Sequence, residues 1–165
     1  MGNTSWRATL IQKIQMVFNG VPQPEMRRLF VAEAMDSYTM PAQSDFVGRW
    51  QDVPDIHLEA CPHALAYLDA TGIQFYLPAF LCWCLRLPDN RRPMAFDHTL
   101  YALDPCPEQQ QMHEHFLERF AGMHHQQLAV IAEFVQICAN KQLADADEIA
   151  ASRYLDQYWH ASLAN

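Results

Sequence analysis

The sequence predicts an all-α protein: a single compact domain over residues 1–165, with about six helices around one buried central helix. Half of the residues are hydrophobic and only 18% are charged, which is typical of a packed core and not of disorder. Only five residues are Gly, a composition that favours helices over sheets. Apolar residues also recur at helical spacing along most of the chain.

Two helices are predicted in the N-terminal quarter. The apolar stripe of the first consists of Trp6, Leu10, Ile14, Val17 and Phe18. Asn19-Gly20 should end this helix, because both residues tolerate a left-handed backbone. Pro24 suits the first position of a second helix, which we expect to reach about Ser37. The buried face of that helix is expected to hold Met26, Leu29, Phe30 and Ala34.

The middle of the chain predicts a loop, a short helix over residues 63–68 that Pro62 opens, and then the central helix. Residues 39–54 show no sustained period, so we expect an ordered loop that Phe46 and Trp50 anchor in the core. The most apolar stretch follows at about 72–87, and a capping box of Thr71 and Gln74 should open it. Pro78 should kink this helix. The stretch is too short to cross a membrane.

The C-terminal half predicts a proline-punctuated connector and three further helices. Residues 88–107 contain four prolines, with a helical turn expected at about 97–103. Helical spacing returns at Met112, Phe116 and Phe120, stops near Gly122, and resumes from Leu128 to Cys138. A last helix should begin near Ala144, with acidic residues at its N-terminus, as the helix dipole prefers.

The chain is acidic, and its charge is distributed unevenly along the sequence. The net charge is −8, which disfavours binding to nucleic acid and to anionic membrane surfaces. Residues 33–69 hold seven acidic side chains and only one basic one, Arg49. This segment therefore carries −6, most of the net charge, in less than a quarter of the chain.

The five cysteines predict reduced thiols and a cytoplasmic location. Their number is odd, and Cys82 and Cys84 sit in an apolar run, as buried free thiols do. Residues 1–18 have the pattern of an amphipathic helix and not of an export signal. Cys106, between two prolines and close to the start of a helix, is the thiol expected to be most exposed.

The histidines suggest a metal site only if several helices contribute to it. His113, His115, His124 and His125 are clustered in the sequence, but none has a second metal-binding residue four positions later. Solvated histidines near a helix junction are the simpler interpretation. No metal ligand and no cofactor is therefore assigned from the sequence.

Signature motifs of catalysis are absent. The sequence contains no nucleophile elbow, phosphate-binding loop or dinucleotide fingerprint. The pairs Asp52/Asp55 and Glu114/Glu118 have spacings that arise by chance at this density of acids, and Glu114 and Glu118 fit a solvated helix face. No catalytic residue is assigned, and the chain is not expected to be an enzyme.

One segment resembles a known family. The run Phe75-Tyr76-Leu77-Pro78-Ala79-Phe80-Leu81 is similar to a "YLPA" signature of an uncharacterised family of small bacterial proteins. Residues 46–53, with Phe46, Gly48 and Trp50, support the resemblance, as does the segment from Phe120 to Phe134. The shared residues are mostly apolar, so the resemblance implies a common core and a bacterial origin, without catalytic residues or a cofactor.

These observations predict a protein-binding function. An acidic helical domain without catalytic motifs fits an immunity or antitoxin-like protein that neutralises a basic toxin. Asp45, Trp50, Asp52 and Asp55 are the candidate partner-binding residues, with Trp50 as an aromatic anchor among outward-pointing carboxylates. The alternatives are that Trp50 is a core residue and the acids only aid solubility, or that His and Glu from separate helices form a metal or catalytic site.

Overall fold

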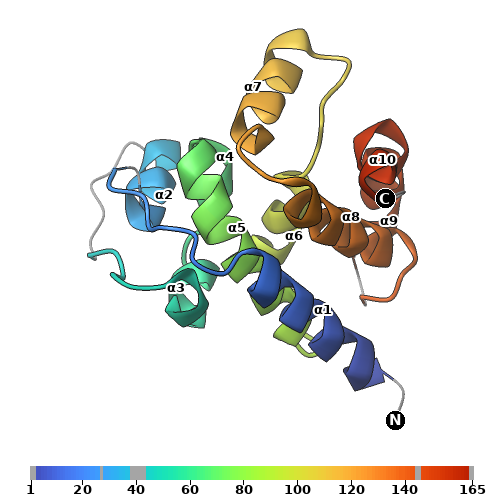
Figure 1. Cartoon of the computed structure of the whole chain (residues 1–165), viewed down its shortest axis with the longest axis horizontal. Coiled ribbons are helices and arrows are strands. Elements are labelled where there is room, and N and C mark those ends of the chain that lie inside the picture. Colours follow the sequence, from blue (N-terminus) through green and yellow to red (C-terminus); the bar gives the residue numbers. More distant parts are fainter. Residues whose placement is uncertain (1–2, 27, 38–43, 144–145, 164–165) are drawn as a thin grey trace.

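The computed structural model describes residues 3–26, 28–37, 44–143 and 146–163, and all regular structure in these ranges is helical, which confirms the all-α prediction (Figure 1). The elements are α1 (Asn3–Val17), α2 (Leu29–Ser37), η1 (Trp50–Asp52), α3 (Asp55–Glu59), α4 (Ala64–Tyr67), α5 (Ala70–Arg86), α6 (Met94–Tyr101), α7 (Gln110–Phe120), α8 (His125–Ala139), α9 (Glu148–Tyr154), η2 (Leu155–Trp159) and α10 (His160–Leu163). The helices are more numerous and shorter than expected. One reason is that prolines divide them: Pro54 and Pro93 directly precede α3 and α6.

Helix α5 is the central element, as the sequence predicted. It contacts α1, α3, α4, α6, α7 and η1, and every residue from Gly72 to Leu85 except Gln74 is buried. The helix continues through Pro78, which supplies no backbone donor. No helix in the described ranges is long and apolar enough to cross a membrane.

The start of α5 differs from the predicted capping box. Asp69 is the N-cap, and its Oδ1 accepts a 2.9 Å hydrogen bond from the backbone N–H of Gly72 and a 2.8 Å bond from the Thr71 hydroxyl. Gln74 instead donates toward Gln127 Oε1 at 3.3 Å. The carboxylate of Asp69 is a full negative charge at the positive end of the helix, so it outcompetes the hydroxyl of Thr71 as a cap.

Helix α1 packs on α5 and α8 through the predicted stripe. Leu10, Ile14 and Phe18 are almost completely buried. The chain leaves the helix through Gly20 at a φ of +76°, the left-handed geometry expected for this stop. The side chain of Gln127 in α8 donates a 3.2 Å hydrogen bond to the Val17 carbonyl. Helix α8 therefore satisfies an orphan acceptor at the end of α1.

Helix α2 begins later than predicted. It starts at Leu29, and Met26 lies ahead of it with 80% of its surface exposed, so the expected burial of Met26 and the first-turn role of Pro24 are both wrong. The reason is a cap from elsewhere in the chain, because Asp45 Oδ1 accepts a 2.9 Å hydrogen bond from the Phe30 N–H. An acceptor at that point fixes where the helix starts.

The segment between α2 and α5 is more helical than a loop. Residues 39–43 of the expected loop lie outside the described residues. Phe46 packs against the core and Trp50 is buried in it, as expected of anchors. From Trp50 the chain forms η1 inside the expected loop, and then α3, which was not predicted. Helix α4 confirms the short helix expected over residues 63–68.

The C-terminal elements pack around an aromatic cluster. Phe116 and Phe120 of α7 lie within 5.8 Å of Trp159, centroid to centroid, and Trp159 is fully buried. The indole N–H of Trp159 donates a 2.9 Å hydrogen bond to the Leu103 carbonyl. In Figure 1, α7 stands at the top of the molecule, away from α1 and the N-terminus.

Candidate functional site

Trp50 lies in the core and not on the surface. Trp50 is only 2% exposed, and its indole Nε1 donates a 2.9 Å hydrogen bond to the Phe18 carbonyl. The bond ties η1 to the end of α1. An indole that is buried and internally satisfied offers nothing for a partner to hold. The geometry therefore agrees with the interpretation of Trp50 as a core residue.

Asp45 points into the fold and not outward as the docking hypothesis requires. It caps α2 through the Phe30 N–H, and burial raises the pKa of its carboxyl above the ordinary value of 3.8, against the lowering effect of that hydrogen bond. A carboxylate committed to a helix N-terminus has little capacity left for a partner's basic side chain.

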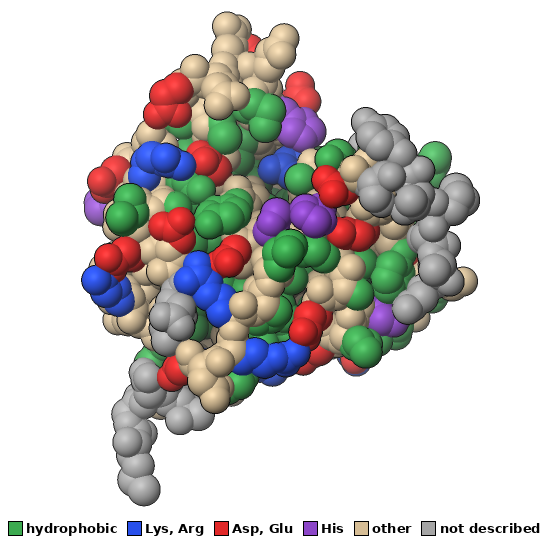
Figure 2. Space-filling view, turned by 180° about the vertical axis from the view of Figure 1, so that it is seen from behind, with side chains coloured by type: hydrophobic (Ala, Val, Ile, Leu, Met, Phe, Trp, Pro, Cys, Tyr) green, Lys and Arg blue, Asp and Glu red, His purple; other side chains and the backbone are tan. Residues whose placement is uncertain are grey.

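Asp52 and Asp55 are exposed, but each has a basic partner. Arg49 Nε lies 2.9 Å from Asp52, and Arg86, in α5, lies 2.6 Å from Asp55. Glu59 is matched in the same way by Arg91. Two of the seven acidic side chains of residues 33–69 are thus matched by arginines from outside the segment, and acidic and basic side chains are interspersed in Figure 2.

The clustered histidines do not converge. His113 Nδ1 contacts the Pro105 carbonyl at 2.6 Å, whereas His115 lines a pocket on the other side of α7. His124 forms the N-cap of α8, and its backbone N–H donates to Gln127 Oε1 at 3.2 Å. Within the described residues, no three His, Cys, Asp or Glu side chains are arranged to hold a metal ion.

Cys106 is half-buried and has a left-handed backbone, with φ at +45°. Burial and the nearby carboxylates of Asp104 and Glu108 raise the pKa of its thiol. A nucleophilic cysteine needs the opposite environment, one that stabilises the thiolate. The other four cysteines are buried free thiols, as predicted for Cys82 and Cys84.

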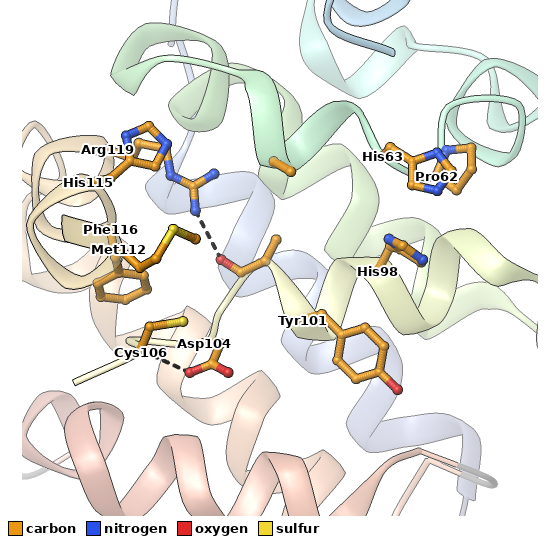
Figure 3. Close-up of a pocket in the computed structure, with 12 residues that line it drawn as sticks. Pro62, His63, His98, Tyr101, Asp104, Cys106, Met112, His115, Phe116 and Arg119 are labelled. Atoms are coloured by element: carbon orange, nitrogen blue, oxygen red, sulfur yellow. Dashed lines mark hydrogen bonds between the residues drawn. The ribbon is translucent and has the colours of Figure 1, made fainter. Parts of the chain in front are cut away.

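A pocket of about 160 Å³ lies between α4, α6 and α7 (Figure 3). Its wall is mainly apolar and aromatic, with histidines and one carboxylate at its edges. The lining residues are Pro62, His63, Ala66, His98, Tyr101, Ala102, Asp104, Cys106, Met112, His115, Phe116 and Arg119. Ala66, Met112 and His115 are exposed, so the pocket opens to solvent on their side.

Arg119 is the one strongly perturbed cation of this pocket. It projects from α7 toward the pocket, and 8% of its surface is exposed (Figure 3). Nη1 donates a 2.5 Å hydrogen bond to the Leu65 carbonyl, and Nη2 donates a 3.4 Å bond to the Ala102 carbonyl. Nε has no partner among the described residues. Burial lowers the pKa of the guanidinium to about 10.

The other charged groups of the pocket are already matched. Asp104 pairs with Arg153 at 3.1 Å and accepts a 2.8 Å hydrogen bond from the Cys106 N–H. His63 contacts Glu33 at 2.9 Å and stacks edge-on against His98, with centroids 4.7 Å apart. Arg119 therefore differs from its neighbours, because no carboxylate in the described ranges forms an ion pair with it.

A second feature is the outer face of α7, formed by Gln110, Gln111, Glu114, Leu117 and Glu118, all of them exposed. Neither Glu114 nor Glu118 forms an ion pair with a Lys or Arg of the described ranges, and only Gln110 donates to Glu114, at 2.9 Å. The charged side chains nearest the top of Figure 2, the end at which α7 stands in Figure 1, are acidic.

Both features lay outside the sequence-based assignment. Arg119 had a detectable signal: it falls one position before Phe120 and three after Phe116, on the apolar side of its helix. A charged residue in such a stripe is unusual, because Arg is rarely buried unless paired. Glu114 and Glu118 gave no signal, because their lack of basic partners depends on tertiary contacts.

Comparison with known proteins gives one match. The model of a family of unknown function, DUF6714, matches residues 6–163. No curated protein and no solved structure matches the chain.

Proposed function

We propose that this chain, which belongs to the family of unknown function DUF6714, is a protein-binding protein whose partner is basic. The observation that carries the proposal is the outer face of α7, where Glu114 and Glu118 are exposed and lack basic partners. By contrast, Asp52, Asp55 and Glu59 are all ion-paired with arginines.

The α7 face holds charge that the fold does not use. Glu114 and Glu118 are four residues apart on one helix, a spacing at which like charges destabilise the helix by about 0.2–0.5 kcal/mol. Neither carboxylate caps a helix. A basic partner would relieve this repulsion, and unmatched charge of one sign accelerates encounter with a partner of the other sign.

One apolar side chain beside these carboxylates offers contact area. Leu117, on the same face, is 40% exposed. A docking surface commonly combines such an apolar part with a polar rim. In its most specific form, the proposal is that the protein acts like an immunity protein or antitoxin and covers a basic toxin; the support for this form is charge complementarity alone.

The test is site-specific photo-crosslinking in the organism of origin, with the full chain. A photoreactive residue replaces Gln111 on the α7 face and, in a matched control, Gln12, which is exposed on α1. We expect one basic protein to be crosslinked from position 111 and not from position 12. Crosslinking that is absent at 111, or equal from both positions, contradicts the proposal.

Two double variants then locate the surface. With the purified partner, E114Q/E118Q should slow association several-fold at low salt, and the effect should shrink as salt screens the charges. D52N/D55N is the matched control, because it also removes two exposed carboxylates but from ion pairs. A larger effect of D52N/D55N would place the partner on the 45–55 segment and overturn the α7 assignment.

A further inference from the structure

We propose that the pocket between α4, α6 and α7 binds a small organic carboxylate, with the carboxylate paired to Arg119 and an apolar body against Phe116, Met112 and Ala66. The inference is independent of the protein-binding proposal, because it concerns the inner side of α7 and a small molecule. Either can fail without the other.

The first argument is the unmatched charge of Arg119. A buried guanidinium without a carboxylate is costly, because the neighbouring atoms do not replace the water that it loses. Its two acceptors are the carbonyl of Leu65, within the single turn of α4, and the carbonyl of Ala102, the C-cap of α6. Neither carbonyl carries a full negative charge, so the guanidinium keeps its net positive charge. An anion in the pocket would complete this environment.

The second argument is the size of the pocket. A cavity of about 150 Å³ accommodates benzene in another protein, and this pocket has about 160 Å³. Figure 3 shows the ring of Phe116 and the thioether of Met112 on the same side as Arg119. Ala66 and Ala102 also line the pocket. The room suits a body of benzene size and not a nucleotide or a peptide.

The third argument is the sign of the charge. Asp104, the carboxylate that lines the pocket, is held by Arg153 and by the Cys106 N–H, and His63 is held by Glu33. Asp104 and Arg153 form a neutral pair. Arg119 is the remaining full charge of the lining residues, so the pocket selects an anionic group and not an ammonium group.

Benzoate, benzamide and inorganic phosphate are suitable probes, because they separate the contribution of an apolar ring from that of a negative charge. Benzoate has the ring and the charge, benzamide has the ring alone, and phosphate has the charge alone. The full chain is titrated with each while amide NMR shifts are recorded. Benzoate should bind saturably and at least about tenfold more tightly than benzamide, as a charge-assisted hydrogen bond is worth at least this factor. Phosphate should bind no better than benzamide.

Pocket variants give the matched control. Ala66→Trp places a large ring at the exposed edge of the pocket and should weaken benzoate binding at least about tenfold. Ala8→Trp makes the same change at an exposed position of α1, far from the pocket, and should leave binding unchanged. Arg119→Met should remove the preference for benzoate over benzamide. If that variant fails to fold, Ala66→Trp still tests the site.

Three results would overturn the proposal. One is the absence of saturable benzoate binding, and another is equal affinity for benzoate and benzamide, because the charge would then contribute nothing. The third is equal weakening of benzoate binding by Ala66→Trp and Ala8→Trp, which would place the binding outside this pocket.

Discussion

Single polar side chains set the helix boundaries of this protein. Asp45 provides the first acceptor of α2, and Asp69 does the same for α5. Arg119 donates to the Leu65 carbonyl in α4 and to the Ala102 carbonyl at the end of α6, and Trp159 donates to the Leu103 carbonyl just beyond α6. In each case a group distant in sequence or just outside the helix satisfies a backbone atom that the helix leaves free. Substitutions at these positions therefore act on whole elements.

Asp45 should make stability depend on pH in a defined direction. Burial raises the pKa of its carboxyl above 3.8, so the folded protein holds this proton more tightly than the unfolded chain does. The stabilising contribution of the group is complete below about pH 3.8 and is lost as the pH rises through the raised pKa. We compare the free energy of unfolding of the parent with that of the Asp45→Asn variant. The parent's value minus the variant's should therefore decrease as the pH rises from 3.5 to about 6.

Urea denaturation at several pH values measures this difference. The Asp52→Asn variant is the control, since that carboxylate is exposed and should give a pH profile much closer to the parent's. A difference for Asp45→Asn that instead grows with pH would show that the hydrogen bond from Phe30 outweighs burial.

Core truncation should separate buried from exposed aliphatic residues. Leu81 in α5 is fully buried, whereas Ile149 in α9 is 80% exposed. Leu81→Ala should lower the free energy of unfolding by about 2–5 kcal/mol, the usual cost of an internal cavity. Ile149→Ala should change it by less than about 0.5 kcal/mol. Urea unfolding curves measure both, and an unchanged midpoint for Leu81→Ala would place α5 at the periphery.

At the scale of elements, α5 organises the fold because it is apolar on every side. It packs against α1, α3, α4, α6, α7 and η1, and Gln74 near its start hydrogen-bonds to Gln127 of α8. Such a helix has no solvent face, so its position requires all its neighbours at once. The short elements η1, α3 and α4 depend on it in return, since alone they are too short to be stable.

The N-cap of α5 should be worth a measurable amount of stability. Asp69→Ala removes the acceptor for the Gly72 N–H and should cost about 1 kcal/mol in urea denaturation. Thr71→Ala removes only a donor to Asp69, so it should cost clearly less. An equal or larger cost for Thr71→Ala would restore the predicted capping box as the dominant interaction.

At the scale of the molecule, charge is distributed in pairs that join distant segments. Arg86 contacts Asp55, Arg91 contacts Glu59, and Arg153 contacts Asp104. Each of these exposed pairs contributes little to stability. Their larger consequence is on the surface potential, because two of them offset part of the acidity of residues 33–69, whereas Glu114 and Glu118 on α7 have no such partner in the described ranges.

The whole molecule should be insensitive to reductant. All five cysteines are free, and four of them are buried. Adding a thiol reductant should leave the melting temperature unchanged. A drop in the melting temperature would show that a disulfide stabilises the protein in solution.

How far the sequence predicted the structure depends on the range of the interactions. The stripe of α1, its stop at Gly20 and the buried run of α5 follow from neighbouring residues, and the sequence predicted them. The start of α2 depends on Asp45, fifteen positions beyond Phe30, and no local pattern shows that. The same limit explains the partner surface: Asp55 looked unmatched until the fold brought Arg86 to it.

The packing of α1 has a consequence during synthesis on the ribosome. Its apolar stripe of Leu10, Ile14 and Phe18 is covered by α5 and α8, yet α8 begins only at His125. At about 5–20 residues per second, that helix emerges roughly 5–20 seconds after α1 is complete. Throughout this interval, part of the apolar face of α1 is exposed to solvent on the nascent chain. Chaperones that bind exposed apolar segments should therefore associate with ribosome-bound chains from which α8 has not yet emerged and dissociate once it has.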